Sequence, residues 1–176
     1  MNANMTMHTM GPSATGTDAA AVRSFILAAD QGRTPAPLDI VGEETLVKVS
    51  LADSDGQLAA FHLVAPPMSG PPRHVHSRED EWFHVLDGEL VFELDGERTV
   101  VGAGGSVWLK RGVVHAYQNF TTSEARLLIV TTPGDFCDLF IEMSAVAKSG
   151  AAAGPAEFAV LNAKYGITVL GPPILS

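Results

Sequence analysis

Three histidines and one glutamate have the residue types and the spacing of metal ligands. His74 and His76 are two residues apart, so on an extended strand both imidazoles leave the same face and can reach one ion. Glu81 follows closely, and His115 stands in a second stretch further along the chain. Imidazole and carboxylate ligands without cysteine suit Fe, Mn, Ni, Co, Cu or Zn and leave coordination positions open for water or substrate. The sequence therefore predicts one divalent transition-metal ion, of unassigned identity, with a catalytic role.

Two alternatives to this interpretation stay open at the level of sequence. Glu79 and Asp80 adjoin Glu81, so all three carboxylates could form a solvated acidic turn, although spacing and strand phase favour Glu81 as the ligand. The histidines could also be ordinary polar residues on separate strands. Three imidazoles and a carboxylate that converge in an apolar interior would, however, be destabilising without an ion.

Further polar residues follow the same strands. Tyr117 and Asn119 lie two and four residues past His115 and should share its inward face if that strand is regular. Two interpretations of Tyr117 stay open: its hydroxyl contacts a substrate or a bound oxygen species, or it is satisfied within the core. His84 is out of phase with the ligand face of its strand, so we expect it to face away. For His62 we expect a cross-strand or surface position.

The two ligand stretches resemble the two motifs of the cupin superfamily. The first motif, G-x5-H-x-H-x(3,4)-E-x6-G, is matched by His74, His76, Glu81 and Gly88. The second, G-x5-P-x-G-x2-H-x3-N, is matched by Gly104, Gly112, His115 and Asn119. Lys110 stands in the proline position, and three residues separate Gly70 from His74 where the pattern has five. Within the superfamily the chain is most similar to small single-domain bacterial proteins of the quercetin 2,3-dioxygenase type.

The resemblance implies both a fold and a function. The implied fold is all-β: a cupin antiparallel β-barrel, a jelly-roll-like double-stranded β-helix, with two C-terminal α-helices. The implied function is a metal-dependent dioxygenase, an oxidoreductase that adds O2 to an aromatic or enolisable hydroxy substrate, with His74, His76, Glu81 and His115 on the metal. Glu81 would double as the base, and Tyr117 is the other candidate catalytic residue. The alternatives are a non-redox metal enzyme (isomerase, lyase or cyclase) and a non-catalytic small-molecule-binding protein. No second acid or base stands out in the expected pocket, which favours the dioxygenase.

Alternating apolar runs separated by turn pairs predict an antiparallel meander. Asp-Gly pairs at 55–56, 87–88 and 95–96 supply the positive φ angles of tight turns. The strands are predicted over residues 45–51, 57–64, 81–86, 89–94, 97–101, 107–109, 115–120 and 126–131. The segment 19–29 is ambiguous between helix and edge strand, and the resemblance implies a strand.

The C-terminal part has a different pattern. Residues 134–148 carry apolar side chains at helical spacing, and a second helix is predicted over residues 155–165, with Gly166 as its C-cap. A small-residue linker, 149–154, separates them, and the tail to residue 176 should be irregular. The predicted organisation is a flexible tail over 1–19, the barrel over 20–133, and over 134–176 a helical extension packed on the barrel.

Composition limits the partners and the compartment. With 176 residues, 46% of them hydrophobic and 18% charged, one globular domain is expected. The net charge of -9 argues against nucleic acid and anionic membrane as partners. Cys137 is the only cysteine, and neither a basic leader nor a run of about 20 apolar residues is present, so we expect a cytoplasmic protein. A small aromatic or hydrophobic substrate is the expected ligand, and the resemblance implies a homodimer. Trp82 and Trp108 are expected in packing or in an interface.

Overall fold

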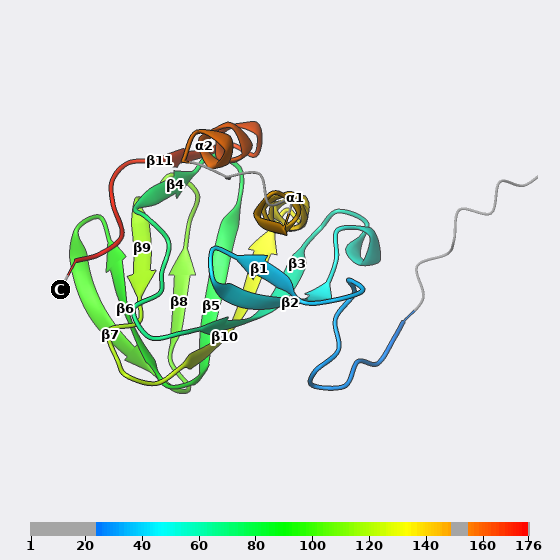
Figure 1. The fold of residues 1–176 in the computed structure, drawn as a ribbon, viewed down its shortest axis with the longest axis horizontal. Coiled ribbons are helices and arrows are strands. Elements are labelled where there is room, and N and C mark those ends of the chain that lie inside the picture. Colours follow the sequence, from blue (N-terminus) through cyan, green and yellow to red (C-terminus); the bar gives the residue numbers. More distant parts are fainter. Residues whose placement is uncertain (1–23, 149–154, 176) are drawn as a thin grey trace, which may run out of the picture.

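Two antiparallel β-sheets face each other, and two helices lie at one end of their strands (Figure 1). The structure is a computed structural model, and it describes residues 24–148 and 155–175. The six-stranded sheet has the order β1-β2-β3-β10-β5-β8, and the five-stranded sheet has the order β11-β4-β9-β6-β7. The predicted all-β cupin-like architecture with two C-terminal helices is confirmed.

The strands of the six-stranded sheet are β1 (Leu38–Ile40), β2 (Glu43–Val49), β3 (Ala59–Ala65), β10 (Ala125–Thr132), β5 (Asp80–Asp87) and β8 (Ser106–Leu109). Those of the five-stranded sheet are β11 (Ile167–Val169), β4 (His74–His76), β9 (His115–Gln118), β6 (Glu89–Leu94) and β7 (Glu97–Gly102). A short 3-10 helix, Ala52–Ser54, follows β2, and the α-helices are α1 (Phe136–Lys148) and α2 (Pro155–Lys164).

The predicted turns at 55–56 and 95–96 join paired strands, and the predicted strand phase is present in β5. The predicted hairpin at 87–88 and the continuous antiparallel meander are wrong, because β5 and β6 lie in different sheets and the chain crosses between the sheets at Gly88. Asp55 and Asp95 have positive φ angles of 51° and 48°, each followed by a glycine that also has positive φ. Along β5, burial alternates so that Glu81, Phe83 and Val85 are buried, as period-two alternation requires of a strand with one face on the core. This phase aims the Glu81 carboxylate into the space between the sheets.

The core lies between the sheets and extends under α1. Phe61 is fully buried on β3, and its ring centroid is 5.0 Å from that of Phe140 on α1. Phe136, at the start of the same helix, is 4.6 Å from Phe140 and 5.2 Å from the ring of His76. The first C-terminal helix therefore closes one end of the core and contacts a candidate ligand directly.

Three predictions about local structure need comment. The C-terminal tail is not irregular throughout, because β11 pairs with β4 and extends the five-stranded sheet. The strand expected over 19–29 is wrong where it can be examined, since residues 24–29 form no strand. The tail 1–19 and the linker 149–154 lie outside the described residues, and the division into domains stays a prediction. Among the helices of residues 24–148 and 155–175, none is long and apolar enough to cross a membrane.

Candidate metal centre

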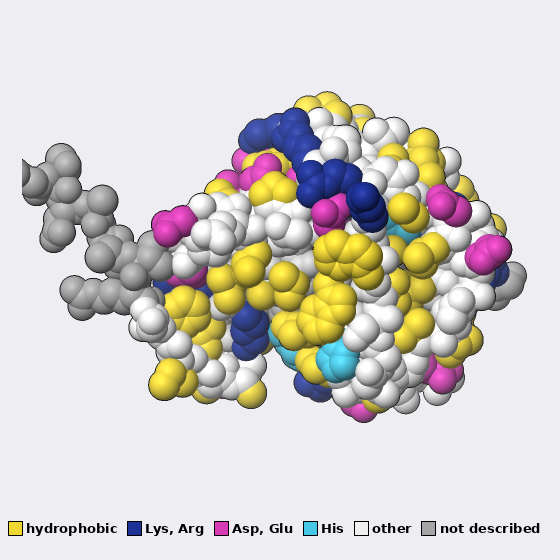
Figure 2. Space-filling view, turned by 180° about the vertical axis from the view of Figure 1, so that it is seen from behind, with side chains coloured by type: hydrophobic (Ala, Val, Ile, Leu, Met, Phe, Trp, Pro, Cys, Tyr) yellow, Lys and Arg dark blue, Asp and Glu magenta, His cyan; other side chains and the backbone are white. Residues whose placement is uncertain are grey.

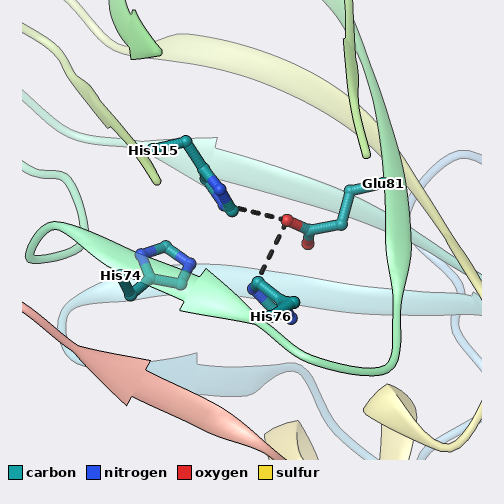
Figure 3. A group of neighbouring side chains, drawn as sticks. All are labelled: His74, His76, Glu81 and His115. Atoms are coloured by element: carbon teal, nitrogen blue, oxygen red, sulfur yellow. Dashed lines mark ion pairs between the residues drawn. The ribbon is translucent and has the colours of Figure 1, made fainter. Parts of the chain in front are cut away.

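The four candidate ligands converge from three strands into the interior (Figure 3). His74 and His76 project from β4, His115 projects from the neighbouring β9 in register with His74, and Glu81 reaches in from β5 of the other sheet. One potential ligand atom from each residue lies within 4.8 Å of all the others. The Glu81 Oε2 atom is 3.4 Å from His76 Nε2 and 3.1 Å from His115 Nε2. The structure thus brings together the four residues that the spacing predicted.

The second nitrogen of each imidazole is already bonded. His74 Nδ1 donates to the Pro72 carbonyl at 2.8 Å, and His115 Nδ1 donates to the Val113 carbonyl at 3.0 Å. His76 Nδ1 lies 3.2 Å from Glu79 Oε2. Because a carbonyl oxygen only accepts, the Nδ1 atoms of His74 and His115 carry a proton. In His76 and His115 the Nε2 atom is the one that faces Glu81. Partners of this kind are what fix ligating imidazoles in metal sites.

The electrostatics favour a cation at this place. Burial, with the charges of His115 and His76, lowers the pKa of His74 to about 3, so its imidazole is neutral near pH 7. Burial alone would raise the pKa of Glu81, but His76 and His115 outweigh it and lower the pKa to about 2. For His76, burial is outweighed by the Glu81 and Glu79 carboxylates, which raise its pKa. An ionised carboxylate therefore sits among three imidazoles in a buried pocket.

Several ligand atoms find no hydrogen-bond partner among the described residues. They are His76 Nε2, His115 Nε2 and Glu81 Oε2, and each is buried. Leaving such atoms unsatisfied costs about 1 to 3 kcal/mol each, and one divalent ion would satisfy all three. The residues present therefore fit a metal ion, whose identity the donor set leaves open.

Glu79 is the buried residue that sequence reasoning missed at this centre. Its side chain is 1% exposed and contacts His76, whereas a solvated acidic turn was an open alternative for it. Asp80 has a different role, because both its oxygens accept hydrogen bonds from Arg111. The position of Glu79, three residues after His76, was the available signal.

An apolar cavity of about 140 Å³ adjoins the candidate ligands. His74, Glu81 and His115 line it at one side. Hydrophobic side chains from both sheets and from α1 form most of the remaining wall, including Leu63, Phe83, Ile129, Phe136, Leu139 and Phe140. The arrangement can hold a small apolar molecule next to the four ligands.

Tyr117 and a second missed carboxylate also line this cavity. The Tyr117 hydroxyl donates to Glu43 Oε2 at 2.6 Å, and Ser69 donates to Glu43 Oε1 at 2.8 Å. The expectation that the pocket contains no second acid or base is therefore wrong. The signal was the alternation of β2: extended two residues back from Thr45, it places Glu43 on the inward face with Thr45 and Val47.

The remaining polar candidates lie outside the cavity. Asn119 is buried, but its side-chain amide donates to the carbonyls of Ala65 and Ser123, so it holds a turn. His84 is half-buried, bonds Ser106 and stacks on Trp82, as expected for a side chain facing away from the site. His62 is half-buried on β3 and is absent from the cavity wall.

Comparisons with known proteins agree with this geometry. Residues 61–131 match the family model described as the Cupin domain. The chain is 43% identical over 53 residues to a β-D-galactosidase of Mycobacterium tuberculosis. The aligned region covers 30% of this chain and 46% of that protein. It is 35% identical over 69 residues to quercetin 2,3-dioxygenase of Bacillus subtilis. This aligned region covers 39% of this chain and 20% of that protein. The chain thus spans less than half the length of either relative.

A solved structure supports the fold. It is an RmlC-like cupin from Shewanella frigidimarina, with a TM-score of 0.51 at 19% identity, covering 63% of this chain and 92% of that chain. The family match includes all four candidate ligands and runs from within β3 to within β10. Residues 61–131 of this chain therefore match the cupin domain in sequence, and the chain is similar to a cupin in fold.

Proposed function

We propose that this protein is a metal-dependent cupin dioxygenase that adds O2 to a small aromatic or enolisable hydroxy compound. The observation that carries the proposal is the set of buried Nε2 and Oε2 atoms that face one another beside an apolar cavity and have no hydrogen-bond partner among the described residues. The likeness to quercetin 2,3-dioxygenase over 69 residues supports the reaction class. Cavities of this kind, apolar with a few convergent polar groups, are typical of small-molecule sites.

In this proposal the chain's own residues position and deprotonate the substrate. His74, His76, Glu81 and His115 would hold the ion, which when bound would supply Lewis-acid and redox chemistry toward oxygen atoms. The Glu81 carboxylate lies at the cavity wall and is the proposed acceptor for the proton of a substrate hydroxyl placed beside it. Tyr117 is the second proposed catalytic residue, since its ring and hydroxyl lie at the cavity. The apolar wall excludes water from the reacting atoms.

A second candidate function has an observation in its favour. Glu43 gives the cavity a carboxyl group besides Glu81, and two such groups are what proton transfer between substrate atoms requires. A non-redox isomerase, lyase or cyclase would use both groups and would consume no oxygen.

Oxygen dependence separates the two candidates. Purified protein is analysed for bound metal and then assayed with flavonols and single-ring phenols in aerobic and oxygen-free buffer. We expect oxygen uptake with turnover and no reaction without oxygen. The Glu81→Gln variant should lose about 10² to 10⁴ in kcat, because its amide cannot accept a proton. Steady turnover by metal-loaded protein in oxygen-free buffer would reject the dioxygenase and favour the second candidate.

The homodimer is likewise a proposal. Figure 2 shows hydrophobic side chains gathered across the middle of the face seen from behind. Trp108 on β8 is 56% exposed and Leu86 on β5 is 46% exposed, and Trp82 pairs with Trp108 across these strands. This outer face of the six-stranded sheet supports a subunit contact, which light scattering measures directly; a monomer mass would reject it. The cytoplasmic location stays a prediction.

A further inference from the structure

The cavity has a polar group that the candidate metal centre does not use. Glu43 lines the wall and is 6% exposed. It begins β2 immediately after a tight turn at Val41 and Gly42, whose φ angles are 54° and 90°. That turn reverses the chain from β1 and sets the phase of β2, so that the Glu43 side chain enters the interior.

Two donors from other segments hold the Glu43 carboxyl. Tyr117 reaches it from β9, and Ser69 reaches it from the loop before β4. The adjoining Gly70 lets this loop lie directly on β9, because a Cβ atom there would come within 2.1 Å of the Tyr117 carbonyl oxygen. A carboxylate offers roughly four acceptor positions, and these two donors fill only part of them. The group is therefore fixed in place and keeps bonding capacity toward the cavity.

The size of the cavity limits what can lie between Glu43 and the candidate ligands. Its volume is about 140 Å³, and a cavity of about 150 Å³ in another protein holds one benzene molecule. Tyr117 follows His115 by two residues on β9, so their Cα atoms lie about 7 Å apart at the usual rise of a strand. A single six-membered ring, or a molecule of similar size, fills this space.

We propose that Glu43 is a substrate-binding residue, which bonds a hydroxyl group of a single-ring molecule whose other oxygen lies at the His74, His76, Glu81 and His115 cluster. The inference rests on the proposed function only in taking that cluster as the metal-holding end. Ser69 acts as a positioning residue for Glu43, and the Tyr117 hydroxyl, besides its proposed catalytic part, orients the same carboxyl group. Burial raises the pKa of Glu43 against the hydrogen bonds from Tyr117 and Ser69, and a carboxyl group can accept a hydrogen bond from a substrate hydroxyl through either oxygen. The site would therefore prefer substrates that carry two oxygen-containing groups on one ring.

Binding of dihydroxybenzenes to the full metal-loaded chain tests this inference. The probes are phenol and the ortho, meta and para isomers of dihydroxybenzene, measured by isothermal titration calorimetry. We expect at least one isomer to bind about tenfold more tightly than phenol, which is the usual effect of one added hydrogen bond. In Glu43→Leu that isomer should bind no better than phenol, while phenol itself binds as in the wild type. Glu43→Gln, which keeps an acceptor and a donor, should retain most of the preference.

The control variant is Thr45→Val. Thr45 is the next inward residue of β2, is fully buried and does not line the cavity. Its hydroxyl donates to the backbone carbonyl of Glu43 at 3.4 Å and does not touch the carboxyl group, so Thr45→Val should leave the preference unchanged. Circular dichroism and metal analysis of each variant establish that it is folded and loaded. Equal binding of phenol and all three isomers by the wild type, or the same loss of preference in Thr45→Val, would overturn the inference. Turnover of the metal-loaded protein without oxygen would instead contradict the proposed function and leave the probe comparison readable, whereas failure of the wild type to bind metal would overturn both.

Discussion

Glu79 holds the imidazole of His76 from within the protein interior. Its Oε2 atom lies 3.2 Å from His76 Nδ1, and both side chains are buried. We expect Glu79→Gln to weaken binding of Co²⁺ or Zn²⁺ about 10- to 100-fold, because carboxylate partners of ligating imidazoles fix the ring and raise its basicity. Titration calorimetry with each metal gives the affinity.

The neighbouring carboxylate supplies the control for this experiment. Asp80 bonds Arg111 rather than an imidazole, so Asp80→Asn should leave metal affinity within about twofold of the wild type. A similar loss in both variants would show that the acidic turn acts through general electrostatics and that Glu79 has no special part in orienting His76.

Motif spacing was sufficient to predict which side chains meet, but not what supports them. Strand periodicity of two residues places His74 and His76 on one face, whereas their convergence with His115 and Glu81 was predicted from the resemblance of the two stretches to the cupin motifs. Strand periodicity does not predict the burial of Glu79, because this residue precedes β5. Its burial depends on how the chain bends after β4. Glu43 lies far from both motifs in the sequence, and its place beside Tyr117 depends on how distant strands pack together.

At the scale of elements, α1 stabilises the end of the core next to the site. Phe140 is 8% exposed and contacts both Phe61 and Phe136. We expect Phe140→Ala to lower the free energy of unfolding by about 3 to 5 kcal/mol, from lost burial and the cavity left behind. Urea denaturation measures this loss. Ile141, the next residue, is 40% exposed, and Ile141→Ala should change stability by about 0.5 kcal/mol or less. Equal effects of the two variants would mean that α1 does not pack as described.

The elements with sustained alternation were predictable, and the short ones were not. Strands β5, β6 and β10 each carry several alternating apolar residues, so the sequence locates them. Strand β11 is only three residues long and follows α2. Its pairing with β4 therefore depends on where the end of α2 lies relative to the five-stranded sheet. Both kinds of element contribute to the site, because β4, which carries His74, pairs with the short strand β11.

A charged cluster ties the C-terminal segment to the five-stranded sheet. Glu93 on β6 accepts hydrogen bonds from Arg73 and Arg98, which also donate to the carbonyls of Pro172 and Leu175. The hydrogen bonds from Arg73 and Arg98 lower the pKa of Glu93 from 4.5 to about 2. A carboxyl with a lowered pKa stabilises the folded state above its unfolded pKa and loses this effect as the pH falls toward the folded value.

The sign of this linkage gives a pH prediction. Between about pH 5 and pH 2, the unfolding free energy of the wild type should fall more steeply than that of Glu93→Gln, which has no proton to gain at this position. Denaturation curves at several pH values measure both slopes. Glu89, which is exposed on the same strand, provides the control, since Glu89→Gln should follow the wild type. Parallel slopes for wild type and Glu93→Gln would contradict the assignment.

At the scale of the whole molecule, the candidate metal centre lies where the two sheets and α1 meet, and these elements are otherwise held together by packing of apolar side chains. Two strands of the five-stranded sheet, one strand of the six-stranded sheet and the first residue of α1 meet at the four side chains. Without an ion, the approach of these segments leaves buried polar atoms with no hydrogen-bond partner among the described residues. The fold therefore holds the site, and an ion at the site would in turn stabilise the fold.

Metal binding should accordingly raise the stability of the entire domain. A ligand that binds only the folded state at about 100 times its Kd adds about 2.7 kcal/mol, which for a chain of this size corresponds to an increase in Tm of about 5 to 10 °C. Differential scanning calorimetry with and without a chelator measures the shift. His115→Ala should abolish it because the variant lacks one ligand, whereas His84→Ala should keep it, because that imidazole bonds Ser106 away from the cavity. The same shift in His115→Ala as in the wild type would place the stabilising ion elsewhere and remove His115 from the proposed ligand set.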